Sequence, residues 1–217
     1  MRINVEDRST MREIFILCWL MAFGKSSVFC QAIDVSLYQQ QYQLTIKKAA
    51  DRIKVDGVGE EGSWQQADSA KDFWLKFPRD DEKARHQTIV KVTYDNNFLY
   101  MLGIVYDSLP LIGQSLKRDS RIRESDGLGL MLDPMNKKTN GAYFTVTAFN
   151  VQADDLLSAG FSNELSFSWD NKWYSATKIH SDHYVIEMAI PFKTLRYNKD
   201  NQVWGINFIR SEKKANE

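Results

Sequence analysis

The sequence predicts an all-β fold, an antiparallel β-sandwich of the jelly-roll or immunoglobulin-like type with about nine or ten strands. Three observations lead to this prediction. Short stretches in which apolar and polar residues alternate recur along the chain, and turn residues separate them. Helical periodicity is scarce. Residues 44–210 contain neither an internal repeat nor a linker, so we expect a single domain there.

A predicted β-hairpin over residues 88–107 organises the rest of the fold. Its first strand alternates, with Val90 and Val92 on one face and polar residues between them. Asp95-Asn96-Asn97 reverses the chain, because Asp and Asn side chains bond to nearby backbone and tolerate left-handed dihedral angles. The second strand, 98–106, is apolar on both faces, which is typical of a central strand. We therefore expect the remaining elements to cover it on either side.

The other predicted elements are shorter. We expect Ser63 to cap a short helical turn that carries Trp64, and residues 192–197 to form a second helical turn after Pro191. The remaining predicted strands cover residues 44–55 (as one strand or two), 72–77, 128–133, 142–149, 173–180, 183–190 and 203–210. The predicted loops cover residues 56–62, 78–85, 134–141 and 151–168.

The start of the chain has the pattern of a targeting segment. Arg12 precedes an apolar run that is too short to span a bilayer, and small and polar residues follow that run. This predicts a secretory signal peptide over residues 1–32; Met11 is an alternative start, and a buried N-terminal helix is the alternative structure. We expect residues 33–43 to be a flexible lead-in and 44–217 to be the sandwich, as a fragment of a longer protein. The protein would then be exported, and be periplasmic, associated with the outer membrane, or secreted.

Composition narrows the class of protein. The 217 residues include 28 basic and 28 acidic side chains, and this balance argues against a nucleic-acid partner because nucleic-acid binders carry a basic excess. Both cysteines, Cys18 and Cys30, lie in the predicted signal peptide. The mature chain would then contain no cysteine, which excludes a disulfide framework, a thiol nucleophile and a cysteine-ligated zinc site.

No group of residues predicts a catalytic centre. The histidines show no serine-hydrolase pattern, and the pair His180 and His183 is typical of an exposed turn, with a metal pair as the alternative. Carboxylates in loops can support glycoside hydrolysis when they lie at the right separation, which a sequence does not reveal. The candidates for that role are Asp119, Glu124, Asp126 and Asp133. We therefore predict no catalytic residue.

The glycine-rich loop at 56–62 is the predicted place for a metal ion. It carries three carboxylates, Asp56, Glu60 and Glu61. Oxygen ligands suit calcium, whereas zinc would usually require the thiolates or histidines that this loop lacks. Calcium is therefore the one cofactor that we consider, although the spacing of these acids is not diagnostic.

Two tryptophans, Trp169 and Trp173, are the candidate platform for a sugar. An indole face can stack on a pyranose ring while neighbouring polar groups bond to the hydroxyls. Arg118, Asp119 and Asp126 are the candidate polar rim of this site. The alternative is that both indoles belong to the core and that the charged residues form surface ion pairs, which is the more frequent arrangement.

Five motifs in order resemble those of family 9 carbohydrate-binding modules. They occupy residues 53–57 (with Glu61 and Trp64), 92–100, 124–133, 184–192 and 204–208. The resemblance implies a β-sandwich without catalytic machinery of its own, sometimes bearing calcium. It also implies a glycan or monosaccharide ligand, and attachment in many members to glycan-degrading enzymes.

Three further features are similar to one subgroup of that family. They are Arg118-Asp119, the pair Trp169 and Trp173, and the stretch 204–210. The subgroup stands at the N-terminus of bacterial envelope proteins, ahead of a predicted outer-membrane β-barrel. The expected partner in the full-length protein is therefore a C-terminal β-barrel or an enzyme domain.

The chain also departs from the sugar-binding members of the family. A stacking tryptophan is expected where Arg123 stands, a glutamate where Gly129 stands and an arginine where Thr145 stands. The second stacking tryptophan would lie beyond Glu217. We expect non-catalytic glycan binding, linked to polysaccharide breakdown by glycoside hydrolases, at a site built differently. The alternative is a structural or interaction module packed against an outer-membrane barrel, and a glycosidase ranks third.

Overall fold

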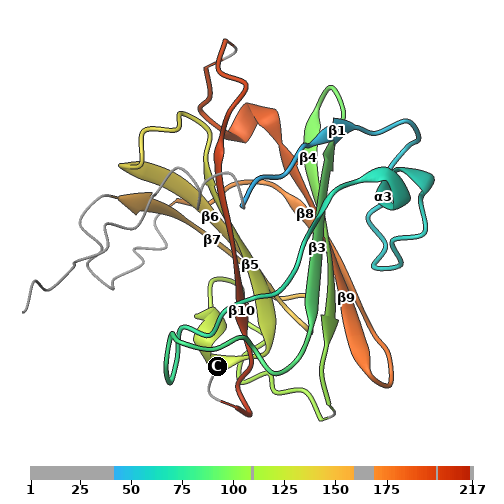
Figure 1. The fold of residues 1–217 in the computed structure, drawn as a ribbon, viewed down its shortest axis with the longest axis vertical. Coiled ribbons are helices and arrows are strands. Elements are labelled where there is room, and N and C mark those ends of the chain that lie inside the picture. Colours follow the sequence, from blue (N-terminus) through green and yellow to red (C-terminus); the bar gives the residue numbers. More distant parts are fainter. Residues whose placement is uncertain (1–41, 109, 159–168, 199, 216–217) are drawn as a thin grey trace, which may run out of the picture. The chain divides into compact units, whose positions relative to one another are not determined.

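A computed structural model describes residues 42–108, 110–158, 169–198 and 200–215. Within these residues the chain forms ten strands and three short helical turns, arranged as two sheets packed face to face (Figure 1). The predicted fold class is therefore confirmed. The predicted signal peptide, 1–32, lies outside the described residues.

One sheet has six strands, and its main order is β1-β3-β4-β9-β8, with β2 paired to β3 as well. The pair β1 and β3 is parallel, and the other pairs are antiparallel. The strands are β1 (Lys47–Lys48), β2 (Ser69–Ala70), β3 (Thr88–Tyr94), β4 (Phe98–Tyr106), β8 (Tyr174–Ile179) and β9 (His183–Pro191).

The other sheet has four strands in the order β10-β5-β6-β7, all antiparallel. Its strands are β5 (Gly127–Asp133), β6 (Asn140–Thr147), β7 (Gln152–Ser158) and β10 (Gly205–Ser211). The helical turns are α3 (Gly62–Gln66), η1 (Ile122–Glu124) and η2 (Phe192–Thr194).

The predicted central hairpin is confirmed as β3 and β4. The Asp95 carboxylate accepts the backbone N–H groups of Asn97 and Phe98, at 2.7 and 2.8 Å, and the hydroxyl of Tyr100 at 2.9 Å. These bonds replace water at the turn and fix the register from Thr88↔Val105 to Tyr94↔Leu99.

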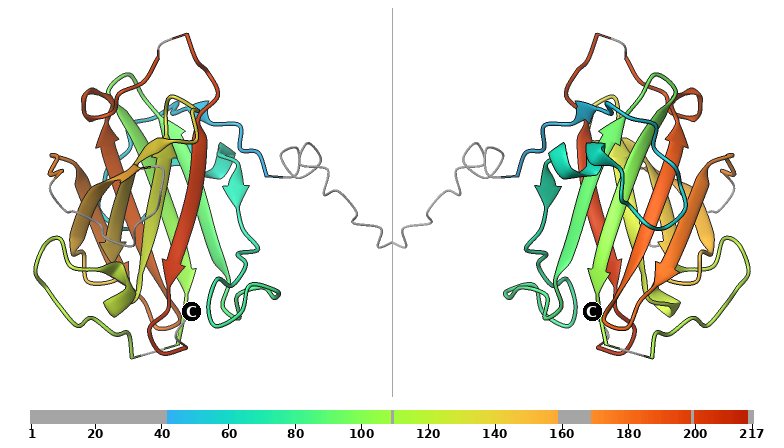
Figure 2. Two further views of the ribbon diagram at one scale, coloured as in Figure 1. Left: turned by 90° about the vertical axis from the view of Figure 1, so that its left-hand side faces the viewer. Right: turned by 90° about the vertical axis from the view of Figure 1, so that its right-hand side faces the viewer.

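Strand β4 is covered on both faces, as its sequence predicts. Leu99 and Met101 on its inner face belong to the core between the sheets. Tyr100 and Leu102 on its outer face pack in a second apolar cluster with Trp64 of α3. Figure 2 shows the segment that carries α3 lying against the outer side of the six-stranded sheet. This segment supplies the outer cover.

The two sheets approach closely at Gly103 of β4. A Cβ atom placed there would lie 2.3 Å from Leu128 Cδ2 of β5, so only glycine leaves room for Leu128. Gly103 pairs with Val90 on one side and with Ile186 on the other. Leu128 therefore reaches across the core into a notch in the opposite sheet.

Four local predictions are wrong. Residues 44–55 give only β1, and 72–77 give only an isolated bridge from Trp74 to Lys83. The expected loop at 151–168 begins with β7; its strand character is hidden by adjacent acids at 154 and 155, which interrupt the apolar alternation. Ser63 does not cap α3, because its hydroxyl accepts the backbone N–H of Ala50 at 2.9 Å and donates to Asp51.

Candidate functional site

The structure brings most of the predicted sugar-site residues into one cluster around Arg118. Its Nη1 donates to Gln152 Oε1 at 2.6 Å, and its Nη2 donates to Asp154 Oδ1 at 2.7 Å. Nη2 also donates to Asp170 Oδ1 at 2.9 Å. Asp119 lies beside the same guanidinium, with Oδ2 3.8 Å from Nε. The Arg118 guanidinium therefore connects the residues before η1 and those before β8 with strand β7.

The two indoles pack on Phe144 of β6. Trp173 is 4% exposed, and its ring meets that of Phe144 edge-on at 5.4 Å. Trp169 is half-buried, and its ring centroid lies 5.7 Å from that of the same Phe144 ring. Neither ring stands free as a stacking platform, so the arrangement agrees with the alternative in which the indoles belong to the core.

Asp154 is the buried acid at the centre of this cluster, and the sequence prediction missed it. Its Oδ1 accepts the indole N–H of Trp173 at 3.0 Å, and its Oδ2 accepts the backbone N–H of Asn171 at 2.8 Å. Burial raises the pKa of Asp154, while these bonds and the Arg118 charge act in the opposite direction. Arg118 is thus engaged with a buried carboxylate, which leaves it poorly placed to serve as a free ligand group.

Asp126 does not belong to this cluster. It is completely buried, and its Oδ2 and Oδ1 accept the backbone N–H groups of Ile112 and Lys213 at 2.5 and 2.7 Å. Its carboxylate joins two loops that are far apart in the sequence. The prediction that it lines a sugar site is therefore corrected: Asp126 is a structural residue.

A shallow cavity of about 450 Å³ lies beside Arg118. Phe149, which is 40% exposed, and Leu116 form its apolar walls, and Asn150 and Gln152 supply amides. The Gln152 amide is already bonded to Ser175 at 2.8 Å, and Ser175 in turn donates to Asn150 at 2.7 Å. Most polar groups of this cavity are therefore satisfied within the protein.

A larger cavity of about 850 Å³ lies between the β3–β4 turn and η2. Three aromatic rings line it, those of Phe98, Phe192 and Tyr197. Phe192 donates its backbone N–H to Asn97 O at 2.8 Å, and the Tyr197 ring lies 5.8 Å from that of Phe192, so the two walls are held together. This cavity, which we call the turn pocket, was not predicted from the sequence.

The polar side chains of the turn pocket are free. Asn96, Asn97, Lys193 and Arg196 line it and are exposed, and their side chains have no hydrogen-bond or ion-pair partner in the described part of the chain. Aromatic rings beside free amides and cations form the arrangement that a polar ring-shaped ligand requires. The sequence shows two Asn residues in a turn and aromatic residues at 192 and 197. Because these residues are far apart in the chain, the sequence alone does not predict that they form one pocket.

Gly129, where the family resemblance implies a glutamate of the sugar site, has close neighbours in the structure. Gly129 of β5 faces Tyr143 and Thr145 of β6, and a Cβ atom at Gly129 would lie 3.0 Å from the Tyr143 ring. Tyr143 is buried, and that burial raises its pKa to about 12. Arg123 lies over the ring of Phe77 at 5.9 Å. A side chain at position 129 would therefore require Tyr143 or Thr145 to shift.

The predicted calcium loop meets a fourth carboxylate. Glu187 of β9 accepts the backbone N–H groups of Asp56 and Gly57 at 2.9 and 2.7 Å. Glu61 accepts the N–H of Lys54 at 2.8 Å, whereas Glu60 is exposed. We call Asp56, Glu61 and Glu187 the acidic cluster. Sequence reasoning missed Glu187, although a single glutamate in the apolar outer row of 183–190 was the signal for it.

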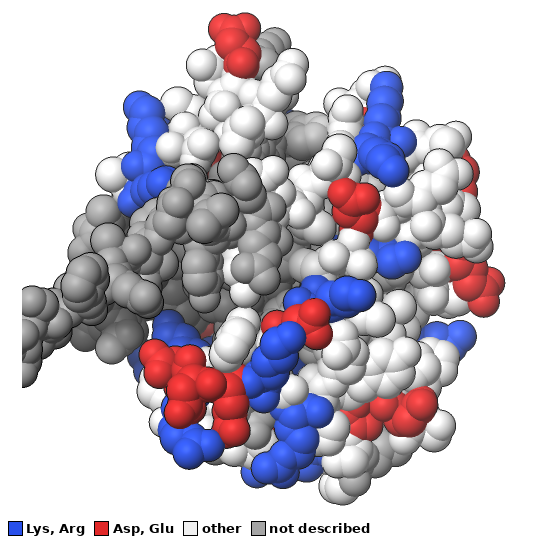
Figure 3. Space-filling view, in the orientation of Figure 1, with Lys and Arg blue, Asp and Glu red and all other residues white. Residues whose placement is uncertain are grey.

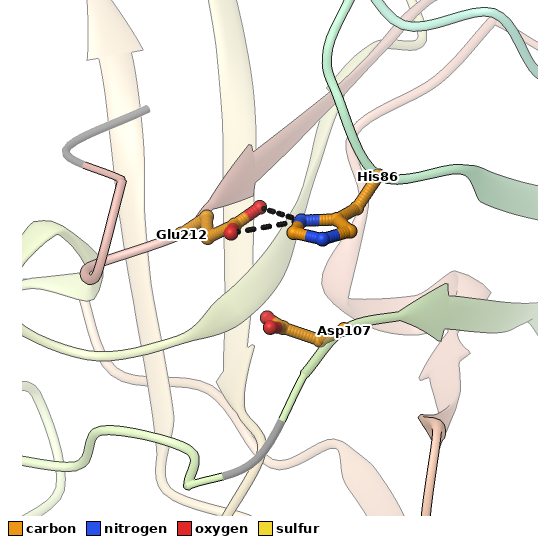
Figure 4. A group of neighbouring side chains, drawn as sticks. All are labelled: His86, Asp107 and Glu212. Carbon is orange, nitrogen blue, oxygen red and sulfur yellow. Dashed lines mark hydrogen bonds and ion pairs between the residues drawn. The ribbon is translucent and has the colours of Figure 1, made fainter.

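A second group of carboxylates gathers just beyond the C-terminal end of β4. Figure 4 shows His86, Asp107 and Glu212, whose ligand atoms lie within 4.8 Å of one another. His86 Nδ1 lies 2.9 and 3.0 Å from the two Glu212 oxygens. Arg210 Nη2 bonds to Glu212 at 2.9 Å and to Asp107 at 3.2 Å, and Lys214 Nζ bonds to Asp107 at 2.7 Å. Cations of the protein already neutralise this ion-paired cluster.

The surface charge is mixed in sign. Figure 3 shows basic and acidic side chains side by side over the described part of one face. The absence of a nucleic-acid partner stays a prediction from composition. No helix among the described residues is long and apolar enough to cross a membrane.

Two curated relatives match part of the chain. Endo-1,4-beta-xylanase C of Paenibacillus barcinonensis is 29% identical over 109 residues, which are 49% of this chain and 9% of the relative. Endo-1,4-beta-xylanase A of Thermotoga maritima is 29% identical over 121 residues, which are 54% of this chain and 10% of the relative. The chain therefore spans about a tenth of the length of these relatives.

Solved structures of low sequence identity share the fold. A family 9 carbohydrate-binding module from Caldicellulosiruptor kristjanssonii in complex with cellotriose has a TM-score of 0.56 at 19% identity, covering 78% of each chain. A putative carbohydrate-binding protein from Bacteroides uniformis has a TM-score of 0.60 at 10% identity, covering 78% of this chain and 83% of the other. These likenesses show that the protein shares their two-sheet β-sandwich fold.

The family assignment rests on the sequence. The profile described as carbohydrate family 9 binding domain-like matches residues 55–217, three quarters of the chain. The chain belongs to this family. The position within it, next to an outer-membrane barrel, stays a prediction.

Proposed function

We propose that this chain binds carbohydrate without catalysing a reaction on it. The observation that supports the proposal most directly is the turn pocket, where rings of Phe98, Phe192 and Tyr197 stand beside free amides and a free guanidinium. Family membership supports the same function. None of the residues around Gly129, where the family's sugar site is expected, lines the turn pocket. A site in this new position would account for a binding module that lacks the usual stacking tryptophan.

The chemistry of the turn pocket suits a saccharide. Tyr197 is 36% exposed and offers a ring face against which a pyranose can stack. Asn96 and Asn97 can both donate to and accept from sugar hydroxyls, and Arg196 adds donors. Because structural neighbours are complexed with cellotriose and glucose, and the curated relatives are xylanases, β-linked glucose and xylose oligomers are the first ligands to test.

Calorimetry on the purified chain tests this proposal. We expect saturable binding of a β-linked oligosaccharide that Tyr197→Ala weakens about tenfold or more, the loss of roughly 1.4 kcal/mol of stacking. The matched control is Phe149→Ala, an equally exposed aromatic residue at the cavity beside Arg118. If Phe149→Ala removes binding and Tyr197→Ala does not, the site lies beside Arg118 instead.

The wider setting follows from the sequence. We propose that residues 1–32 direct export, that 44–217 form the binding module, and that the protein is periplasmic, bound to the outer membrane or secreted. An attached enzyme domain would link it to polysaccharide breakdown by glycoside hydrolases, as the names of the xylanase relatives suggest. Detection of the processed chain in the periplasmic or membrane fraction, starting near residue 33, tests export.

A second candidate function is a structural or interaction module packed against an outer-membrane β-barrel. The burial of Trp173 and the filling of the Gly129 position by Tyr143 favour it, since both remove expected sugar contacts. Absence of binding to every glycan on an array would support this candidate over the first. Crosslinking of the full-length envelope protein would then locate the surface that meets the barrel.

A further inference from the structure

We propose that the turn pocket selects sugars that carry a carboxylate, such as a uronic acid within a β-linked oligosaccharide. The proposal rests on the carbohydrate binding proposed above and adds the class of ligand that the same pocket prefers. It departs from the structural neighbours, since the ligands named for them, cellotriose and glucose, are uncharged. The reasons are the charge of the pocket and the fixed position of its aromatic wall.

The charged side chains that line the turn pocket are all positive. Lys193 and Arg196 belong to the lining, and no carboxylate does. Both residues are exposed, and neither side chain forms a hydrogen bond or an ion pair within the described residues. The pocket therefore presents two uncompensated cations to a ligand.

The acids that lie close to the pocket in the sequence do not compensate this charge. The carboxylate of Asp95 accepts two backbone N–H groups of the β3–β4 turn and the hydroxyl of Tyr100. Asp133 accepts a backbone N–H of the turn that follows it, and Asp200 is exposed; neither lines the pocket. None of these three acids forms an ion pair with a cation of the pocket in the part of the chain that the structure describes.

The cavity beside Arg118 provides a comparison. There the guanidinium donates to Asp154 and Asp170 at 2.7 and 2.9 Å, so the protein itself compensates its charge. Because a guanidinium can bond to both oxygens of one carboxylate, the free Arg196 is the group in the turn pocket that best matches a carboxylate ligand. Lys193 adds a second positive charge without a fixed bonding geometry.

The aromatic wall beside these cations is held in place by its own contacts. The Tyr197 ring centroid lies 5.8 Å from that of Phe192 and 5.5 Å from that of Trp204. Leu195 donates its backbone N–H to Phe192 O at 3.1 Å, which closes the helical turn before Tyr197. Since Arg196 and Tyr197 both line the pocket, a sugar stacked on the Tyr197 ring can direct an acidic substituent toward the guanidinium.

Calorimetry of the whole chain at neutral pH and low salt tests the proposal. The two probes are xylotriose that carries one glucuronic acid branch and the methyl ester of the same compound, which has the same rings but no charge. We expect the acid to bind about tenfold or more tightly than the ester. Raising NaCl to about 0.5 M should reduce this preference, because salt screens interactions between exposed charges.

Substitutions separate the recognition of charge from the binding of the sugar ring. Arg196→Gln should bring the affinity for the acid down to that for the ester, and Lys193→Gln should reduce the preference in part. Tyr197→Ala should weaken the binding of both compounds. The matched control is Arg85→Gln, because Arg85 is exposed, does not line the pocket and precedes β3 at the end away from the β3–β4 turn. It removes the same net charge and should keep the preference.

Four results would overturn the proposal. The first is equal affinity for the acid and the ester, which leaves sugar binding intact but removes the selection of charge. The second is a preference that persists in both Arg196→Gln and Lys193→Gln, since the carboxylate would then bind elsewhere. The third is tighter binding of sulfated xylotriose than of the acid, since the pocket would then select a sulfate. The fourth is that neither probe binds: if cellotriose still binds, only the selection of acidic sugars fails, and if it does not, the carbohydrate binding proposed above fails as well.

Discussion

The acidic cluster and the ion-paired cluster differ in which groups compensate the charge of their carboxylates. Asp107 and Glu212 of the ion-paired cluster are buried, and so is Glu187 of the acidic cluster. In the ion-paired cluster, Arg210 and Lys214 provide the counter-charges from the end of β10 and just beyond it. In the acidic cluster, Glu61 and Glu187 have backbone donors only. The buried carboxylates of one cluster are therefore paired with cations, whereas Glu61 and Glu187 have no ion-pair partner among the described residues.

The unsatisfied atoms of the two clusters differ in kind. In the ion-paired cluster they are Arg210 Nε and the Tyr184 hydroxyl, both of which can donate a hydrogen bond. In the acidic cluster they are carboxylate oxygens, which only accept. The unpaired buried atoms therefore differ between the clusters in whether they can donate a hydrogen bond.

The largest expected effect on the free energy of unfolding comes from removing the Arg210 guanidinium at the centre of the ion-paired cluster. Arg210→Met would leave Asp107 and Glu212 without their shared partner, and breaking a buried ion pair in this way costs about 3–5 kcal/mol. Urea unfolding followed by tryptophan fluorescence measures this loss. The control is Lys214→Met at the edge of the same cluster, for which we expect about 1 kcal/mol or less.

The same substitution should act with opposite sign in the two clusters. Glu212→Gln removes a charge that His86 and Arg210 bind, so it should lower the free energy of unfolding by about 1–3 kcal/mol. Glu187→Gln in EDTA removes an uncompensated charge and adds an amide donor beside Glu61, so it should raise that energy by about 1 kcal/mol. Equal losses for both variants would remove the distinction between the clusters.

The pH dependence of stability sharpens the comparison. Because the fold raises the pKa of Glu187, the folded state retains a proton that the unfolded state releases. The Glu187 carboxyl therefore contributes its full stabilisation of the folded state below the unfolded pKa of about 4.3. This stabilisation is lost as pH rises through the pKa of the folded state, by at most about 1.4 kcal/mol per pH unit. Wild-type protein should therefore lose stability relative to Glu187→Gln as pH rises above about 4.3, which urea unfolding at a series of pH values measures.

The smallest effect is expected at Glu60. It is a carboxylate in the loop that was predicted to bind calcium, but it is exposed and belongs to neither cluster. Glu60→Gln should change the free energy of unfolding by no more than about 0.5 kcal/mol, at any calcium concentration. A calcium-dependent effect of Glu60→Gln would restore the ligand set first inferred from the sequence.

The sequence predicted the fold wherever local pattern and tertiary environment agree. The central hairpin was predicted because Asp95 bonds to its own turn and because β4 is apolar on both faces, and both signals are local. Strand β7 was missed because Asp154 resembles a loop residue until Arg118 and Trp173 are placed beside it. That pairing spans distant segments, and no local pattern encodes it.

The site residues show the same limit. Trp169, Trp173, Arg118 and Asp119 do come together, so the sequence grouped them correctly, but packing on Phe144 decides that the indoles face the core. The turn pocket depends on residues 96–98 and 191–197 meeting across β4 and β9. Chain reversal brings these segments together, and only the strand order reveals it.

The notch at Gly103 gives the sandwich a mechanical property. Leu128 of one sheet sits in the gap that Gly103 leaves between Val90 and Ile186 of the other. Sliding of one sheet over the other would force the Leu128 side chain against the branched side chains of Val90 and Ile186. The Leu128 side chain therefore opposes sliding of the two sheets over each other at the centre of the sandwich.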